Sequence, residues 1–220
     1  MRTLVWLGLA MLLLSYSLVA AKPKVTQTVA TGRPLVVIDP GHGGVDPGAV
    51  SHTGIQEKAI NLAVSWVTAN RLQAAGIAVA LTRQGDHPAL RAKRFVVVDD
   101  LHYRAWMTRH LGATLFLTIH TNSEPTGTAF GPIIYYVAGR PASYQLARAL
   151  SSGFTQVFGR SADIRPIRQT VLLEAGVPAA NVELGFLTHR QDTAKLISPS
   201  YQRALGSAIS RGVIRYLGYG

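Results

Sequence analysis

The chain has 220 residues and contains no cysteine. It therefore forms no disulfide bond and carries no lipid attached through a cysteine thiol. Histidine, aspartate and glutamate are the remaining side chains that could hold a transition metal ion. No low-complexity tract is present, and 48% of the residues are hydrophobic against 15% charged, as is typical of a globular protein. This length suits one domain with a substantial core and leaves little room for a second.

Long apolar runs are absent except near the N-terminus, where 17 uncharged residues at positions 4–20 follow a short basic start. A basic start, an apolar run and small residues after it are typical of a secretory signal peptide. We therefore expect a signal at 1–21, a polar linker at 22–33 and one folded domain at 34–220, exported to the periplasm or cell envelope. The alternative is an uncleaved anchor, because 17 apolar residues lie at the lower limit for crossing a bilayer.

Acidic residues are scarce, since 11 Asp and Glu face 22 Lys and Arg for a formal net charge of +11. The basic residues are scattered along the chain rather than gathered on one helix or arm, so we do not expect a nucleic acid partner. For an exported protein, an anionic cell-wall polymer or a membrane surface suits this charge better. The charge is equally consistent with a role in solubility alone.

Apolar, β-branched segments alternate with amphipathic segments from Pro34 onward. Apolar residues of the first amphipathic segment follow the i, i+3, i+4, i+7 spacing of a helix, which Gly76 closes. This alternation predicts a single three-layer α/β domain, with a mostly parallel sheet flanked by helices on both faces. We expect strands at 35–39, 77–83, 114–120, 132–138 and 180–187, and helices at 57–75, 99–111, 142–157 and 199–217.

Two histidines directly follow apolar, β-branched runs. His42 lies in the sequence IDPGHGG, and His120 lies in TIHTNS. Open α/β sheets bind their ligands at the carboxyl ends of the strands, so both side chains are expected at one edge of the sheet. Glycines around His42 permit a tight turn and leave the ring uncrowded. The loop lacks the GK[ST] sequence of a phosphate-binding loop, so a shared metal ion and an ordinary loop are the two interpretations left open.

Two glutamates accompany the histidines. Glu57 begins a predicted helix, where the helix dipole favours a carboxylate even without a metal. Glu183 lies inside the apolar strand ANVELGFL, where a buried carboxylate is costly unless it is paired or functional. Burial would also raise its pKa toward the range useful for proton transfer near neutral pH. Together these residues predict a zinc site with one spare carboxylate, suited to metal-assisted hydrolysis.

These residues fall within five motifs by which the chain resembles the zinc-dependent N-acetylmuramoyl-L-alanine amidases, the cell-wall amidases of the amidase type 3 family. The resemblance runs from about Leu35 to Leu217. Five motifs in the family's order are far more specific than any single one. They are VVIDPGHGG at 36–44, QEK at 56–58, LTR at 81–83, IHTNS at 119–123 and VELGFL at 182–187.

The resemblance implies one zinc ion per chain, held by His42, Glu57 and His120, with Glu183 as the catalytic residue. It makes residues 34–220 the catalytic domain. The implied reaction is hydrolysis of the amide bond between N-acetylmuramic acid and the L-alanine of the peptidoglycan stem peptide. The carboxylate would take a proton from water and deliver it to the departing nitrogen. The implied partner is peptidoglycan, and we expect a monomer with no membrane segment beyond the signal.

Asn122 and Arg83, which belong to two of the motifs, are expected to orient the substrate or a metal ligand. The chain departs from the family pattern at His189 and over residues 165–173, which affects inferences about substrate contacts only. An inserted inhibitory helix, present in regulated relatives, is not expected, so the domain should be active alone. Two alternatives remain: a zinc peptidase or deacetylase that acts on wall polymer, and a peptidoglycan-binding module without catalysis.

Overall fold

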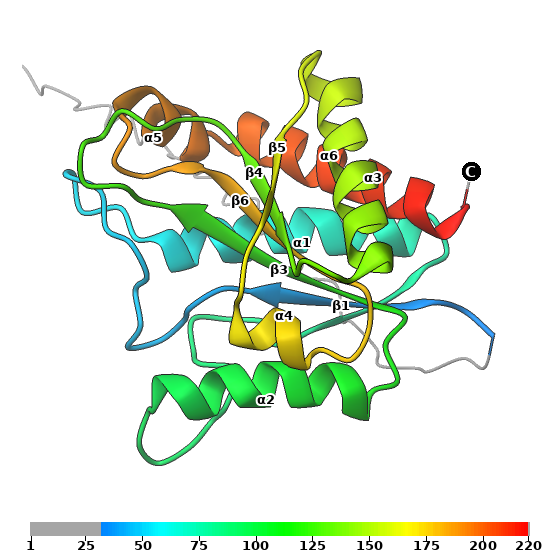
Figure 1. Ribbon diagram of the computed structural model, residues 1–220. Helices are drawn as coiled ribbons and strands as arrows, with labels where there is room; N and C mark the ends of the chain where they lie inside the picture. Colours follow the sequence, from blue (N-terminus) through cyan, green and yellow to red (C-terminus); the bar gives the residue numbers. More distant parts are fainter. Residues whose placement is uncertain (1–31, 220) are drawn as a thin grey trace, which may run out of the picture.

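The computed structural model describes residues 32–219 (Figure 1). The predicted signal and nearly all of the predicted linker lie outside the described residues. The described residues form a six-stranded sheet with the order β2-β1-β3-β6-β4-β5. Neighbouring strands run parallel except β4 and β6, which are antiparallel. The strands are β1 (Leu35–Pro40), β2 (Ala78–Leu81), β3 (Leu115–Asn122), β4 (Ile133–Tyr136), β5 (Asp163–Pro166) and β6 (Ala179–Phe186).

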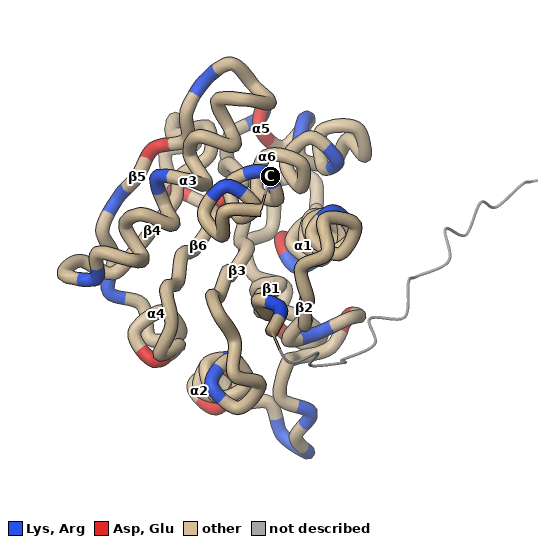
Figure 2. The backbone as a smooth tube through the Cα atoms, turned by 90° about the vertical axis from the view of Figure 1, so that its right-hand side faces the viewer, with Lys and Arg blue, Asp and Glu red and all other residues tan. Residues whose placement is uncertain are grey.

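Helices cover both faces of the sheet. One face carries α1 (Glu57–Ala74), α3 (Pro141–Phe158) and α6 (Pro199–Leu217), and the other carries α2 (Val97–His110) and the short α4 (Thr170–Glu174). A further short helix, α5 (Arg190–Leu196), packs against β6 and α6. Seen end-on in Figure 2, the strands lie between these two helical layers, and Lys and Arg are spread over many elements. The three-layer α/β fold expected from the sequence is confirmed.

The core consists of two apolar clusters, one on each face of the sheet. Alternate side chains of β1, such as Val36 and Ile38, face the α1, α3 and α6 layer, whereas Val37 faces α2 and α4. Glycines let α3 and α6 approach closely. A Cβ atom on Gly153 would lie 2.1 Å from the carbonyl oxygen of Ala208, so only glycine permits this contact.

The expected elements are confirmed with small changes in their ends, and three short elements are additional. These are β5, α4 and α5, none of which exceeds seven residues. The segment between β3 and β6 therefore holds β4, α3, β5 and α4. Over residues 32–219, no helix is both long and apolar enough to cross a membrane.

Candidate metal centre

Three neighbouring strands bring the predicted site residues to one edge of the sheet. His42 follows β1 by two residues, and His120 lies near the end of β3. Glu183 lies on β6, directly opposite His120 in the parallel register of the two strands. Glu57 is the first residue of α1 and reaches the same edge because its helix begins there. The fold thus gathers residues that are up to 141 positions apart, as 183 minus 42 shows.

His42, Glu57 and His120 form a group that is able to bind a metal ion. Each offers one ligand atom, and these atoms lie within 4.8 Å of one another. Oε2 of Glu57 is 3.3 Å from Nε2 of His42, and Oε1 of Glu57 is 2.9 Å from Nδ1 of His120. Two imidazole nitrogens and a carboxylate oxygen that converge in this way are typical ligands of a transition metal ion.

Glu57 is buried, with 4% of its surface exposed, and is held by several donors. The backbone N–H groups of Ala49 and Thr121 donate to its carboxylate at 2.8 and 2.9 Å, and the Asn61 amide donates at 3.0 Å. Burial alone would raise the pKa of Glu57, but the two histidine rings outweigh that effect and hold the pKa well below its ordinary value. The carboxylate is therefore ionised and its position is fixed before any metal binds.

His42 has a φ of 61°, in the left-handed region that residues other than glycine rarely adopt. Such backbone strain costs about 1–3 kcal/mol and is concentrated at functional sites. Nδ1 of His42 lies 2.8 Å from Oδ2 of Asp46, a contact that orients the ring. Burial disfavours the charged ring, but hydrogen bonds to Glu57 and Asp46 outweigh it and raise the pKa of His42 to about 9. A metal ion would therefore displace a proton from this ring at neutral pH.

Two glycines leave space for the histidine rings. A Cβ atom on Gly41 would lie only 2.2 Å from the His120 ring. A Cβ atom on Gly48, whose φ is +65°, would lie 2.6 Å from both the carboxylate of Glu57 and the ring of His42. The glycine-rich sequence of this loop is therefore required by the packing of the three side chains, in addition to the turn that it makes.

Two buried arginines support the loop that carries His42. Arg83 is 1% exposed and donates hydrogen bonds to the backbone carbonyls of Pro40 (2.8 Å), Gly41 (2.9 Å), Lys58 (2.8 Å) and Gly85 (2.9 Å). The substrate contact expected of Arg83 would need an exposed guanidinium group. Its position inside the protein favours a structural role instead.

Arg104 on α2 is the second arginine, and its role was not predicted from the sequence. It is 2% exposed and donates to the carbonyl oxygens of Pro40 and His42 at 3.0 and 2.9 Å. Its charge is balanced by two buried carboxylates, Asp39 at 2.5 Å and Asp100 at 2.7 Å. Burial raises the pKa of Asp39, but Arg104 and hydrogen bonds from two threonine hydroxyl groups outweigh it and keep the pKa below its ordinary value.

Glu183 is partly buried, and its Oε2 atom has no hydrogen-bond partner among the described residues. Burial raises the pKa of Glu183 above its ordinary value, and the charge of Glu57 adds to this, whereas His120 acts in the opposite direction. A carboxylate with a raised pKa and an unpaired oxygen, close to the His42–Glu57–His120 group, is suited to general acid–base chemistry. Asn122 lies at the end of β3, where its Oδ1 atom accepts a hydrogen bond from the N–H of Ser123 at 2.8 Å.

A cavity of about 310 Å³ lies beside the His42–Glu57–His120 group. His42 and His120 line it, together with Val97 and Leu101 of α2 and Val171 of α4. The cavity therefore gives a substrate access to the two histidines between α2 and α4.

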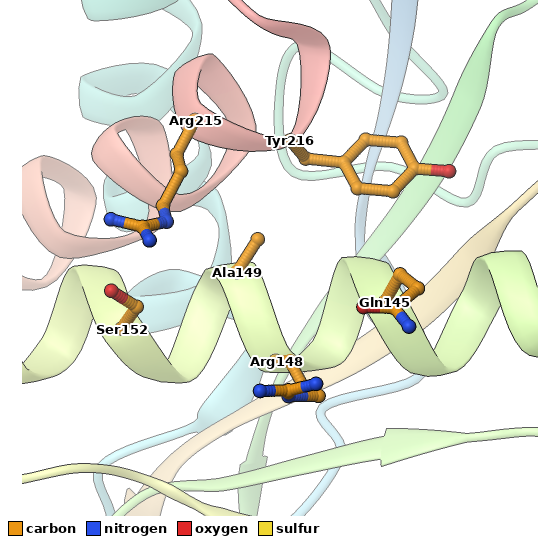
Figure 3. A pocket seen from close by; sticks show the side chains of 6 residues that line it. All are labelled: Gln145, Arg148, Ala149, Ser152, Arg215 and Tyr216. Atoms are coloured by element: carbon orange, nitrogen blue, oxygen red, sulfur yellow. The ribbon is translucent and has the colours of Figure 1, made fainter.

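A second hollow, of about 530 Å³, lies between α3 and α6 on the other face of the sheet. Figure 3 shows Arg148 and Gln145 of α3 on one side of it and Arg215 and Tyr216 of α6 on the other. None of His42, Glu57 and His120 lines this hollow, so the two cavities are separate.

Known proteins resemble the chain in both sequence and fold. The profile of a family described as N-acetylmuramoyl-L-alanine amidase matches residues 36–215. The chain is 27% identical to the amidase AmiA of Escherichia coli K12, over 89% of this chain and 80% of AmiA. An amidase structure from Clostridium difficile 630 superposes with a TM-score of 0.77 at 32% identity, covering 84% of this chain and 97% of the other. The catalytic domain of CwlV from Bacillus (Paenibacillus) polymyxa superposes with a TM-score of 0.75 at 30% identity, covering 85% and 99%.

Fold and site define an α/β enzyme with a candidate metal centre at the edge of its sheet. The chain belongs to the N-acetylmuramoyl-L-alanine amidase family, and it is a hydrolase that acts on peptidoglycan. The sequence resemblance and the class of enzyme inferred from it are confirmed.

Proposed function

We propose that the protein is a zinc-dependent enzyme that cleaves the amide bond between N-acetylmuramic acid and the L-alanine of the stem peptide. The observation that carries this proposal is the His42–Glu57–His120 cluster beside Glu183. The ligand atoms of this cluster lie within 4.8 Å of one another. Ligand atoms about 2.0–2.1 Å from a tetrahedral zinc ion lie about 3.3 Å apart, so small movements of the side chains would complete the site. Three protein ligands are also the number that a catalytic zinc site uses, which leaves Glu183 outside the ligand set.

The three ligands and Glu183 have separate roles. A bound zinc ion supplies Lewis-acid polarisation of the scissile carbonyl and acidifies a water molecule. Glu183 would accept a proton from the attacking water and then donate it to the departing alanine nitrogen, acting as general base and then as general acid. Burial raises the pKa of Glu183 above its ordinary value, which makes the carboxyl group a better proton acceptor than an exposed glutamate. Arg104 and Asp46 hold the loop and the ring of His42 in place for this chemistry.

The role of Glu183 is tested by the Glu183→Gln substitution. This change keeps the size of the side chain and removes its ability to carry a proton. We expect kcat to fall by at least about 10²- to 10⁴-fold, while KM changes much less and zinc stays bound. Glu174→Gln, which alters a half-exposed carboxylate paired with His102, is the control and should keep wild-type kcat. A Glu183→Gln protein with near wild-type turnover would refute the mechanism.

The metal assignment is tested by His42→Ala and His120→Ala. Each variant should lose zinc, measured by elemental analysis, and lose activity, because two protein ligands hold a zinc ion far less tightly than three. Far-UV circular dichroism should be unchanged, because the apolar clusters on the two faces of the sheet do not include these rings. A normal zinc content in both variants would exclude this ligand set.

The identity of the bond is tested by mass spectrometry of digested peptidoglycan. An amidase releases stem peptides with a free L-alanine amino terminus beside unsubstituted glycan, whereas a peptidase or a deacetylase does not. A binding module without catalysis would release nothing. Product analysis therefore separates the proposed reaction from each of the alternatives.

We further propose that the protein acts outside the cytoplasm, in the periplasm or cell envelope, as a monomer that needs no activator. The apolar segment at 4–20 and the location of the peptidoglycan substrate support the export. The purified domain from residue 22 should digest peptidoglycan alone and elute as a monomer in size-exclusion chromatography. A domain that stays inactive until a partner protein is added would contradict this proposal.

A further inference from the structure

Asn181 is a buried polar residue next to the proposed general base. It lies on β6 two residues before Glu183, so both side chains point to the same face of the sheet. Only 2% of its surface is exposed. Its Nδ2 atom donates to Oε1 of Glu183 at 3.1 Å and to Oε1 of Gln169, at the start of α4, at 3.3 Å.

The orientation of the Asn181 amide follows from its neighbours. Nδ2 carries two N–H groups, and an ionised Glu183 offers only acceptor oxygens, so the nitrogen end of the amide must face the carboxylate. The other end, Oδ1, has no hydrogen-bond partner among residues 32–219. A buried polar side chain with an unpaired oxygen costs stability. Stability of the fold therefore does not explain why asparagine stands here.

The two oxygens of Glu183 differ because of this contact. Oε1 is occupied by the Asn181 amide, whereas Oε2 is buried and has no partner among the described residues. The side chain is thereby fixed with one oxygen held and the other free for exchange of a proton. Gln169 extends this arrangement, since it lines the cavity at His42 and His120 and shares the same amide group.

We propose that Asn181 is a positioning residue for catalysis: its amide holds Oε1 of Glu183 so that Oε2 is presented to the water and to the leaving nitrogen. This inference rests on the proposed catalytic role of Glu183. General acid–base catalysis requires the carboxylate oxygen within about 2.6–3.2 Å of the proton that it transfers, so loss of the fixed orientation lowers turnover. Binding of the substrate does not depend on this orientation.

The test is the Asn181→Leu substitution, which removes the hydrogen-bond donor and keeps a side chain of similar size. We expect kcat to fall about 10- to 100-fold, the size of loss that removal of a hydrogen-bond partner causes at metal sites. KM and zinc content should stay close to the wild-type values. The melting temperature should change little, because removal of the unpaired Oδ1 offsets the loss of the donor to Oε1 of Glu183. Asn181→Ala, which adds no bulk, is the second variant if leucine does not fit.

The matched control is Ser143→Ala, which removes a hydrogen bond at the other end of the same strand. The Ser143 hydroxyl accepts a hydrogen bond from the N–H of Ala179 at 3.1 Å. Ala179 is the first residue of β6, at the end of the strand away from Glu183. A purely structural change in β6 should lower the melting temperature and leave kcat unchanged. The two variants are therefore expected to show opposite effects, with Asn181→Leu losing turnover and Ser143→Ala losing stability.

A double-mutant cycle separates an action through Glu183 from a general effect on the site. In a Glu183→Gln background, Asn181→Leu should cause no further loss of the residual rate. A second loss as large as the first, or a wild-type kcat in both Asn181 variants, would overturn the inference. If Glu183→Gln is itself fully active, the proposed function is wrong. If Glu183→Gln is inactive but both Asn181 variants keep wild-type kcat, only the role proposed for Asn181 is wrong.

Discussion

Replacing Arg104 with methionine should destabilise the protein strongly, although Arg104 touches no ligand atom. Methionine keeps most of the apolar length of the side chain but leaves the buried carboxylates of Asp39 and Asp100 without their cation. Breaking a buried ion pair by removing one partner typically costs about 3–5 kcal/mol. Asp39 keeps its hydrogen bonds from Thr82 and Thr118, so we expect a value within this range rather than above it.

The dependence of this loss on pH identifies its cause. In the wild type, the pKa of Asp39 is held below its ordinary value of 3.8. The ionised carboxylate therefore stabilises the fold above pH 3.8. This stabilisation is lost as the pH falls through the lower pKa of the folded state. Without Arg104, burial dominates and raises the pKa of the same group. The folded variant then binds a proton as the pH falls, so the difference from the wild type should be smaller at pH 5 than at pH 7.

Urea unfolding of both proteins at pH 7 and pH 5, followed by circular dichroism, measures these differences. Arg109→Met is the matched control on the same helix, because Arg109 is exposed and, among residues 32–219, its side chain donates to no group other than the carbonyl of Glu174. Its free energy of unfolding should change by no more than about 0.5 kcal/mol. A loss below about 1 kcal/mol for Arg104→Met, where a broken buried pair costs several, would refute the reasoning. A loss that is the same at both pH values would also refute it.

Further predictions concern the loop around His42. Gly41→Ala should release the metal, seen by elemental analysis, because the new Cβ atom would lie 2.2 Å from the His120 ring. The free energy of unfolding, measured with urea, should be about 1 kcal/mol higher for His42→Gly than for His42→Ala, because only glycine adopts the φ of 61° without strain. Arg83→Met should lower thermal stability and zinc affinity together and leave KM for peptidoglycan unchanged. A raised KM alone would instead support the hypothesis that Arg83 contacts the substrate.

The sequence predicted the main elements because the buried strands are mostly apolar, β-branched runs and α1 has periodic apolar residues. The helix α2 differs, because its buried face consists mainly of polar residues. It did not predict β5, because Asp163–Pro166 is largely exposed and contains no apolar run. The five-residue helix α4 is too short to show a helical period. The antiparallel direction of β4 was also missed, since the composition of a strand does not encode the direction of its neighbour.

The proposed ligands were accessible from the sequence because each histidine follows a strand and Glu183 interrupts an apolar one. The same signal, a carboxylate inside the apolar run LVVID, applies to Asp39 and could have identified the buried network. Arg104 gives no such signal, because an arginine on a helix is usually exposed. The role of Arg83 was assigned from its motif alone, whereas its burial depends on contacts between segments that are distant in the chain.

The pairing of β3 with β6 has a consequence for how this site tolerates change. His120 and Glu183 lie opposite each other on the two strands, so hydrogen bonds of the backbone set the spacing between a proposed metal ligand and the proposed base. Side chains alternate between the faces of a strand, so inserting or deleting one residue in β6 before Glu183 would turn its carboxylate toward the α1, α3 and α6 layer. The length of β6 up to Glu183 therefore cannot change by a single residue, whereas a substitution leaves the register of the strand intact.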